Sequence, residues 1–324
     1  MITGFSYLKA KSVKEAISGL SQGNARLHAG GTDLLGCLRD RVFTIDTMVS
    51  ISGLRELKGI RETPEGGLSI GALTTITEVS ESRVIRDRYP ALARAALEVA
   101  SPQLRNQGTL GGNLCQKPRC WYYRGEFHCL RKGGDTCYAF AGENHYHCIF
   151  GGNRCYIVHP SDTAPALTAY EATISIAGPA GMRNVSIDRF FVPASEDVTR
   201  ETVLEKGEIV TGIMLPSPSG ELKSSYRKVR ARQSWDFALA GVALALRMSG
   251  STVADARIVL SGAAPVPWRP VEAEKALIGN VLSPGSIRRT AALSVSRAQP
   301  LKHNAYKVPL FRGMIEEELM SLSN

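Results

Sequence analysis

The pattern of apolar and polar positions in the first 60 residues predicts a small parallel βαβ unit. Val13, Ile17 and Leu20 lie three or four residues apart and form one apolar helical face, and Ser12 precedes it with Glu15 at capping-box spacing. Two glycines then separate an apolar strand from a second apolar helical turn. The expected elements are a helix over residues 12–21, a strand over 25–29, a helix over 34–38 and a strand over 48–51.

The next part of the chain, up to residue 215, predicts an antiparallel half. It mixes strand-like alternation with helical stretches, and a Gly-Pro-Ala-Gly turn between two alternating runs is typical of a β-hairpin. The expected elements are a strand over 68–70, helices over 77–84 and 91–100, a hairpin of 172–177 with 184–187, and a strand over 209–215.

A Pro-Ser-Pro-Ser-Gly segment at residues 216–220 interrupts both periodicities and predicts a linker. Because 324 residues exceed one typical core, we expect two domains, 1–219 and 220–324, the first divided into 1–58 and 59–219. Residues 237–248 suit a helix through their alanines or a buried strand through their unbroken apolar run. The other elements expected in the second domain are a strand over 253–261 and helices over 271–278, 286–296 and 309–322.

Composition indicates a chain that folds and argues against some functions. Hydrophobic residues make up 44% and charged residues 21%, as in ordinary globular proteins. No run of about 18 apolar residues appears, and Met1–Phe5 lacks the layout of a secretion signal, so no membrane contact is expected. The cytoplasm is the expected compartment, with the periplasm as the alternative if an exported partner carries the chain. The net charge of +9 comes from scattered Lys and Arg, so nucleic acid is not an expected partner.

Two glycine loops supply the first candidate chemistry. Residues 29–34, Ala-Gly-Gly-Thr-Asp-Leu, join a strand to a helix start, where close backbone approach, free N–H groups and the helix dipole suit a diphosphate. Residues 109–113, Thr-Leu-Gly-Gly-Asn, repeat the pattern. The spacing matches neither the GxGxxG fingerprint nor the Walker loop. Two loops of this kind can hold one diphosphate, and two independent tight turns are the alternative.

The cysteines supply the second candidate chemistry. Six of seven fall between Cys115 and Cys155, and such local clustering favours metal binding over disulfides. No CxxC pair occurs, which disfavours a zinc ribbon, whereas widely spaced thiolates in a basic loop suit an iron-sulfur cluster. The loop histidines His128, His145 and His147 are expected to be exposed, with metal ligation as the alternative. The basic residues that can offset the charge of a cluster are Arg119, Arg124, Arg131, Lys132 and Arg154.

The two glycine loops, together with motifs later in the chain, resemble the FAD-binding medium subunits of the xanthine dehydrogenase family of molybdenum hydroxylases. The similarity spans nearly the whole chain, and the motifs occur in the same order. The later motifs are Val-His-Pro-Ser-Asp at 158–162, Ala-Pro-Ala-Leu at 164–167, Tyr-Arg-Lys-Val-Arg at 226–230, Ala-Pro-Val-Pro-Trp-Arg at 264–269 and Asn-Ala-Tyr-Lys-Val at 304–308.

An insertion over about residues 115–157 narrows this resemblance. It is similar to the insertion in the medium subunits of 4-hydroxybenzoyl-CoA reductase and of bacterial aldehyde oxidoreductases, which implies a [4Fe-4S] cluster. Cys148 departs from that pattern, and we interpret Cys115, beside the second glycine loop, as a packed thiol. The ligands that the resemblance implies are Cys120, Cys129, Cys137 and Cys155.

The resemblance also implies an α+β fold and a cofactor site. The fold would be a two-part FAD-binding domain, with a small parallel βαβ part and an antiparallel-sheet part, followed by a smaller α+β C-terminal domain. Asp33 would also cap the helix that follows its loop. The residues expected to hold FAD are Leu27, His28, Ala29, Gly30, Gly31, Thr32, Asp33, Leu34, Thr109, Gly111, Gly112, Asn113, Asp162 and Lys228.

The function implied is electron transfer within a heteromeric molybdenum hydroxylase of the aldehyde or xanthine oxidoreductase type, without a catalytic residue on this chain. A large molybdenum-cofactor subunit and a small [2Fe-2S] subunit are the expected partners, and ferredoxin or NAD an electron partner. One alternative is the beta subunit of a 4-hydroxybenzoyl-CoA reductase-type enzyme. A zinc-stabilised binding module and a freestanding oxidase with FAD attached covalently near His28 are the others.

Overall fold

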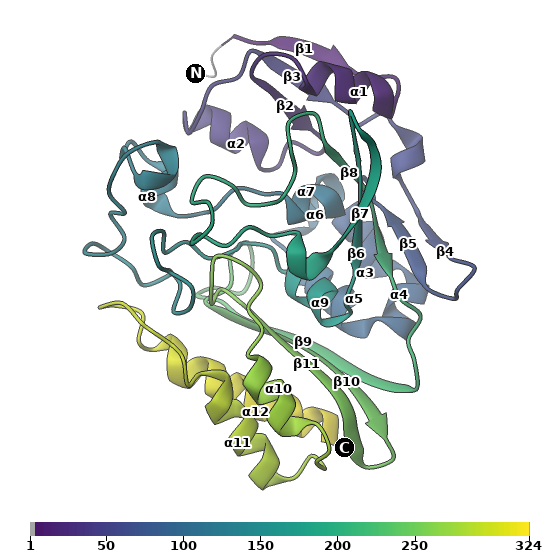
Figure 1. The fold of residues 1–324 in the computed structure, drawn as a ribbon, viewed down its shortest axis with the longest axis vertical. Helices are drawn as coiled ribbons and strands as arrows, with labels where there is room; N and C mark the ends of the chain where they lie inside the picture. Colours follow the sequence, from purple (N-terminus) through teal and green to yellow (C-terminus); the bar gives the residue numbers. More distant parts are fainter. Residues whose placement is uncertain (1–3, 324) are drawn as a thin grey trace.

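Three β-sheets follow one another along the chain in the computed structural model, which describes residues 4–323 (Figure 1). The first three residues of the Met1–Phe5 start therefore lie outside the described residues. The first sheet is parallel in the order β1-β3-β2, which confirms the parallel unit expected here. Its elements are β1 (Ser6–Lys9), α1 (Val13–Leu20), β2 (Ala25–His28), α2 (Leu34–Arg39), β3 (Thr47–Ser50) and a 3-10 turn, η1 (Arg55–Leu57).

The second sheet has five antiparallel strands in the order β4-β5-β8-β6-β7. The strands are β4 (Ile60–Glu62), β5 (Leu68–Gly71), β6 (Thr173–Gly178), β7 (Gly181–Ser186) and β8 (Ile209–Leu215). Helices that pack on it share its apolar core, which includes Ile70, Leu92 and Leu167. The helices of this part are α3 (Ile76–Glu81), α4 (Arg83–Arg88), α5 (Pro90–Leu97), α6 (Pro102–Gln107), α7 (Leu110–Leu114), α9 (Thr163–Ala169) and η3 (Ile187–Arg189).

The third sheet is antiparallel in the order β11-β10-β9, and three helices cover one face of it (Figure 1). It contains the ambiguous run at 237–248, which forms a strand from Ala240 onward. Leu244 packs in the core shared with these helices, whereas Ala243 packs in the core of the second sheet, so a strand buried on both faces reads as an unbroken apolar run. The elements are β9 (Glu221–Val229), β10 (Ala240–Ser249), β11 (Thr252–Ser261), α10 (Val271–Leu277), α11 (Pro284–Ser294) and α12 (Lys307–Ser323).

The α+β class is thus confirmed, and some expected elements need correction. The loop expected at residues 109–113 is mostly the short helix α7, because Thr109 caps it by accepting a hydrogen bond from the Gly112 N–H. Strands β1, β4 and β9 were not expected; β9 carries Lys and Ser at half-buried positions, which conceal its alternation. The domain boundaries near residues 58 and 219 stay predictions. Among residues 4–323, no helix has the length and apolar content needed to cross a membrane.

The cysteine-rich insertion, residues 115–157, contains only two short elements, α8 (Trp121–Arg124) and η2 (Leu130–Lys132). Tertiary contacts therefore hold it in place. Ile149 and Phe150 enter the apolar core of the third sheet, where the Phe150 ring stacks on Trp268 at 4.9 Å between centroids. Asn304, just before α12, donates from its side-chain amide to the carbonyls of His147 and Cys148, both at 3.0 Å.

Candidate functional site

The two glycine loops lie against each other. A Cβ atom added at Gly30 would stand 1.8 Å from the carbonyl oxygen of Gln107, just before the second loop. Gly31 has φ of +72°, a left-handed conformation that favours glycine. The loops therefore form one structure rather than two separate turns, and Gly30 is required for their contact.

The first loop has the unused hydrogen-bond donors. Within residues 4–323, the backbone N–H groups of Gly30, Gly31 and Thr32 meet no protein acceptor. In the second loop, by contrast, the Leu110 N–H donates to Thr74 O and the Gly111 N–H to Ala72 O, both at 2.9 Å. The capacity to bind an anion through backbone N–H groups therefore lies mainly in the first loop.

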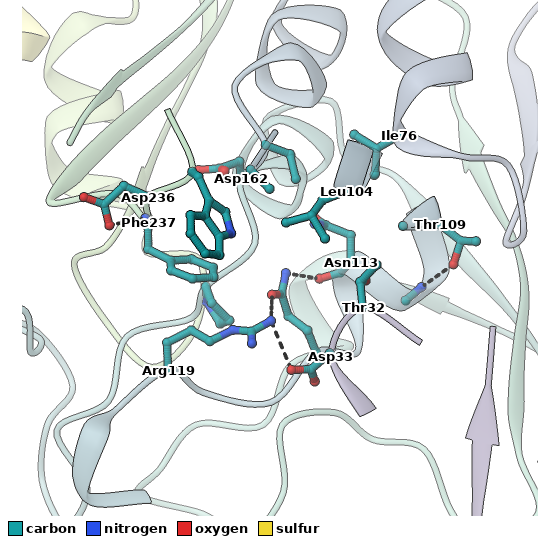
Figure 2. Close-up of a pocket in the computed structure, with 17 residues that line it drawn as sticks. Thr32, Asp33, Ile76, Leu104, Thr109, Asn113, Arg119, Asp162, Asp236 and Phe237 are labelled. Atoms are coloured by element: carbon teal, nitrogen blue, oxygen red, sulfur yellow. Dashed lines mark hydrogen bonds and ion pairs between the residues drawn. The ribbon is translucent and has the colours of Figure 1, made fainter. Parts of the chain in front are cut away.

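Two cavities meet at these loops. The larger one, of about 770 Å³, has the size of a cofactor site and extends from the first loop to residues 199–210. The smaller one, of about 160 Å³, lies between the loops, the helix α6 region and residues 235–237 (Figure 2). The residues that line both cavities are Thr32, Asp33, Thr109, Gly112 and Gln116.

Most of the predicted cofactor residues line one of these cavities. Asn113 and Asp162 line the small cavity, and the other predicted residues of the two loops line the large one. His28 lines neither; its Nδ1 lies 3.4 Å from the Ser50 hydroxyl, and burial lowers the pKa of its ring. The predicted residues on the large cavity are Leu27, Ala29, Gly30, Gly31, Thr32, Asp33, Leu34, Thr109, Gly111 and Gly112.

Asp33 was expected to cap α2, but it does not. Its carboxylate makes no hydrogen bond to the helix start and instead accepts from the insertion. The Lys117 N–H donates to it at 2.7 Å, and the Arg124 and Arg119 guanidinium groups contact it at 2.7 and 3.0 Å. Two cations and a backbone donor thus attract this side chain away from the helix, and Asp33 ties the first glycine loop to the start of the insertion.

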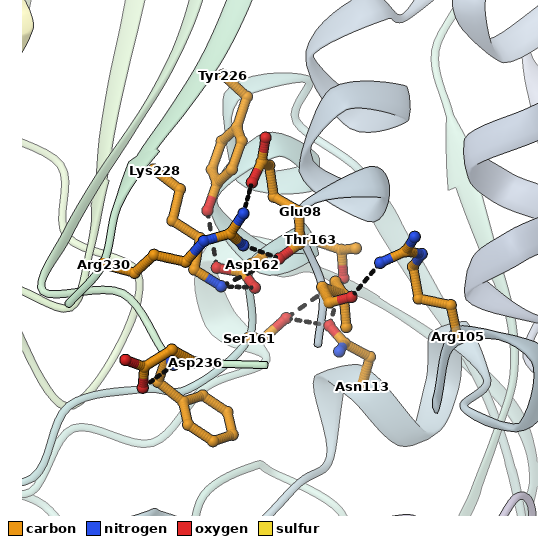
Figure 3. A network of polar contacts seen from close by, with 12 residues as sticks. Glu98, Arg105, Asn113, Ser161, Asp162, Thr163, Tyr226, Lys228, Arg230 and Asp236 are labelled. Carbon is orange, nitrogen blue, oxygen red and sulfur yellow. Dashed lines mark hydrogen bonds and ion pairs between the residues drawn. The ribbon is translucent and has the colours of Figure 1, made fainter. Parts of the chain in front are cut away.

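Asp162 and Lys228 form a buried ion pair beside the small cavity (Figure 3). Their charged atoms are 2.7 Å apart, and the Lys228 side chain has no exposed area. Tyr226 donates from its hydroxyl to the same carboxylate at 2.9 Å. Burial raises the pKa of Asp162, while Lys228 and Tyr226 act in the opposite direction. Lys228 itself lines neither cavity; it contacts Asp162, which lines the small one.

Arg119, Trp235 and Phe237 are among the residues of the small cavity that were not predicted to hold the cofactor, and Figure 2 labels Arg119 and Phe237. The Arg119 guanidinium lies over the Phe237 ring, 4.9 Å from its centroid. Trp235 has φ of +54° and donates its N–H to Ala100 O at 3.2 Å. None belongs to a glycine motif, and only the fold brings them together.

The buried ring of His159 should make the stability of the protein depend on pH. The ring is 5% exposed and packs edge-on against Phe191, and burial lowers its pKa from 6.5 to about 4. Between these values the unfolded chain binds the proton and the folded chain does not, so stability decreases as pH falls. The unfolding free energy of the wild type should therefore decrease between pH 6.5 and pH 4. In His159→Phe we expect this decrease to be smaller by about 3 kcal/mol.

Urea unfolding at several pH values measures this effect. Replacement of the exposed His145 by glutamine is the matched control and should leave the pH profile unchanged. An equal acid loss in wild type and His159→Phe would show that His159 is not the group responsible.

Four cysteines line a third, smaller cavity inside the insertion: Cys120, Cys129, Cys137 and Cys155. They are the four predicted ligands. Cys148, 1% exposed, does not line it, and Cys115 lines the large cavity instead. All seven cysteines are unpaired thiols. Within residues 4–323, no group of three or more His, Cys, Asp or Glu side chains is arranged to hold a metal ion.

The thiols of this cavity interact with one another and with a histidine. The hydrogen bond with Cys155 lowers the pKa of Cys137 to about 6, and burial raises the pKa of Cys120 to about 11. His147 was expected to be exposed but is buried; its Nε2 lies 3.2 Å from the Cys120 sulfur, and burial lowers its pKa to about 4. Contacts with Trp121 and Tyr122 draw this ring inward.

Comparison with known proteins shows which family the chain belongs to. Residues 3–218 match the family described as the FAD binding domain in molybdopterin dehydrogenase. Residues 224–321 match the CO dehydrogenase flavoprotein C-terminal domain. The chain belongs to the family of FAD-binding medium subunits of molybdenum hydroxylases, and it is an oxidoreductase subunit.

Relatives match over nearly the whole chain. The aldehyde oxidoreductase FAD-binding subunit PaoB of Escherichia coli K12 is 36% identical, with 97% of each chain covered. The carbon monoxide dehydrogenase medium chain of Hydrogenophaga pseudoflava is 30% identical, covering 97% of this chain and 96% of the other. A solved carbon monoxide dehydrogenase from the same organism superposes with a TM-score of 0.79 over 99% of this chain and 98% of that chain, at 28% identity.

Proposed function

We propose that this chain carries FAD and a [4Fe-4S] cluster and transfers electrons within a molybdenum-dependent aldehyde oxidoreductase. The observation that carries the proposal is the adjacency of two sites. The large cavity, which begins at the glycine loops, and the cysteine cavity share two lining residues, Tyr123 and Arg131. One subunit thus offers neighbouring positions for a dinucleotide and for a thiolate-bound group.

The cavities suit the parts of FAD. The first loop, with its unused N–H groups at the start of α2, is the proposed site of the pyrophosphate. The small cavity, with apolar Ile76 and Leu104 and aromatic Trp235 and Phe237, provides flat walls for the isoalloxazine ring. The large cavity then receives the adenosine half. Bound there, FAD supplies one- and two-electron chemistry, while the chain holds and orients it.

The cysteine cavity suits a cluster better than zinc. A zinc site draws its ligands around one ion, with Zn–S distances of about 2.3 Å. In a four-iron cluster each thiolate binds a separate iron, so the thiols surround a larger body. Cys120, Cys129, Cys137 and Cys155 line one cavity, as four thiolates around one cluster would.

The proposed partners are a large molybdenum subunit, where substrate is oxidised, and a small [2Fe-2S] subunit, which relays electrons to this chain. The support is the match to PaoB, a subunit of an aldehyde oxidoreductase, over almost its full length. We propose the cytoplasm as the compartment and ferredoxin or NAD as electron partner. Co-expression of the three subunits followed by purification tests the assembly, and we expect all three to purify together. Purification of this chain alone, loaded with flavin, would count against it.

Anaerobic purification with flavin and iron analysis tests the two cofactors. We expect absorbance near the flavin maximum, flavin released by acid, and about four irons per chain. Flavin that stays with the precipitated protein would instead indicate covalent attachment, which the position of His28 outside both cavities does not favour. Zinc without flavin or iron would refute the proposal.

Two cysteine substitutions separate ligand from packed thiol. Cys129→Ser is expected to abolish the cluster's electron paramagnetic resonance signal while FAD remains bound, because this cysteine lines only the cysteine cavity. Cys148→Ala is the matched control: it lies in the same insertion and is equally buried, but outside that cavity, so iron content should not change. A loss of iron in Cys148→Ala would mean that Cys148 is a ligand and that one of the four proposed ligands is wrong.

A further inference from the structure

Arg131 occupies the wall between the two proposed cofactor sites. It is one of two residues, with Tyr123, that line both the cysteine cavity and the large cavity. Its side chain is only 3% exposed. Its guanidinium lies 5.9 Å from the centroid of the Tyr123 ring, which packs in turn against Cys37 and Cys129.

A fixed network holds this guanidinium. Arg131 donates from Nη2 to the Arg200 carbonyl at 3.0 Å and to the carboxylate of Glu201, and from Nη1 to the Val198 carbonyl. Glu201, 8% exposed, also pairs with Lys117. The network of two cations and one carboxylate therefore has a net charge of +1, and its Arg131 and Glu201 side chains are buried, whereas Lys117 is partly exposed.

The other basic residues of the insertion are placed differently. Arg119 and Arg124 pair with Asp33, and Lys132 donates to the Gly125 carbonyl at 2.6 Å. Arg154 is next to Cys155 in sequence, but its side chain is exposed. Within residues 4–323, Arg131 is the only one of these five that lines the cysteine cavity.

A buried charge acts more strongly than an exposed one. Reduction adds a negative charge to an iron-sulfur cluster, so a nearby cation stabilises the reduced form and raises the reduction potential. Water and salt screen exposed charges, whereas a buried pair in a low-dielectric surrounding is screened much less. Arg131 and Glu201 should therefore act on the cluster with opposite signs.

We infer that the buried charge of Arg131 raises the reduction potential of the cluster, and that the charge of Glu201 lowers it. This inference rests on the proposed cluster. Arg131→Gln removes the cation and leaves Glu201 paired with Lys117, so no buried carboxylate is stranded. Glu201→Gln removes the carboxylate and leaves both cations.

Redox titration of the complete complex, followed by the electron paramagnetic resonance signal of the cluster, tests the inference. We expect a lower potential in Arg131→Gln, a higher potential in Glu201→Gln, and a value near wild type in Arg131→Lys. Arg154→Gln is the matched control, since it removes an exposed arginine beside a ligand, and it should not shift the potential. If Arg131 and Glu201 had only a structural role, the reduction potential would shift in the same direction in Arg131→Gln and Glu201→Gln, or would not shift.

Iron analysis of the same samples separates the two ways to fail. Iron present in every variant, with unshifted potentials or shifts of the same sign in Arg131→Gln and Glu201→Gln, would overturn this inference and leave the proposed cluster standing. Absence of iron from the wild-type complex would overturn the proposed cluster and this inference together. If Arg131→Gln loses iron, the other two variants decide. A higher potential in Glu201→Gln, with Arg131→Lys near wild type, supports the inference, and an unchanged or lower potential in Glu201→Gln overturns it.

Discussion

Gly30→Ala is expected to abolish flavin binding and to destabilise the protein by about 3 kcal/mol or more, since overpacking against an immobile group is at the upper end of such effects. The new Cβ would stand 1.8 Å from the Gln107 carbonyl oxygen. That atom belongs to the backbone and has no rotamer by which to move away, so the two glycine loops must separate. Separation displaces the first loop, where the unused N–H groups lie.

Flavin content per chain and thermal unfolding measure this outcome. Gly36→Ala is the matched control in the helix that follows the same loop, because its Cβ would meet only Arg124 Nη1 at an ordinary 3.8 Å. It should bind flavin normally and change stability by no more than about 1 kcal/mol, in the favourable direction. Normal flavin content in Gly30→Ala would contradict the contact between the loops. Gly31 is a less informative position, because its φ of +72° makes any side chain strained.

Lys228→Met is expected to cost about 3–5 kcal/mol of unfolding free energy, the usual effect of removing one member of a buried ion pair. Asp162 would remain at a buried position with only the Tyr226 hydroxyl as its side-chain partner. The same substitution should reduce flavin retention, because Asp162 lines the small cavity and its orientation depends on Lys228.

A double-mutant cycle with Asp162→Asn distinguishes a pair from two unrelated sites. In the double variant neither residue carries a charge, so the combined loss should be clearly smaller than the sum of the two single losses. Additive losses would mean that the 2.7 Å contact contributes no coupling.

The sequence predicted the local features well. The first glycine loop, the βαβ order of β2, α2 and β3 and the hairpin depend on neighbouring residues, whose spacing and turn chemistry are visible along the chain. The four predicted cysteines indeed share one cavity, while Cys148 and Cys115 lie outside it. Local patterns did not show β9, whose polar residues occupy half-buried positions between two packed layers. The run at 237–248 was ambiguous for a related reason, since its burial on both faces depends on two distant cores.

The sequence by itself determined which residue types are available: two glycine loops, a run of cysteines and a basic insertion. Only the tertiary structure decided how they are used. Asp33, expected to cap a helix, accepts hydrogen bonds from Lys117 and Arg124 because the insertion folds over its loop. The folded insertion also places Arg131 in the wall between two cavities. Contacts between residues far apart in sequence arise from packing, which has no period along the chain, so patterns of spacing cannot reveal them.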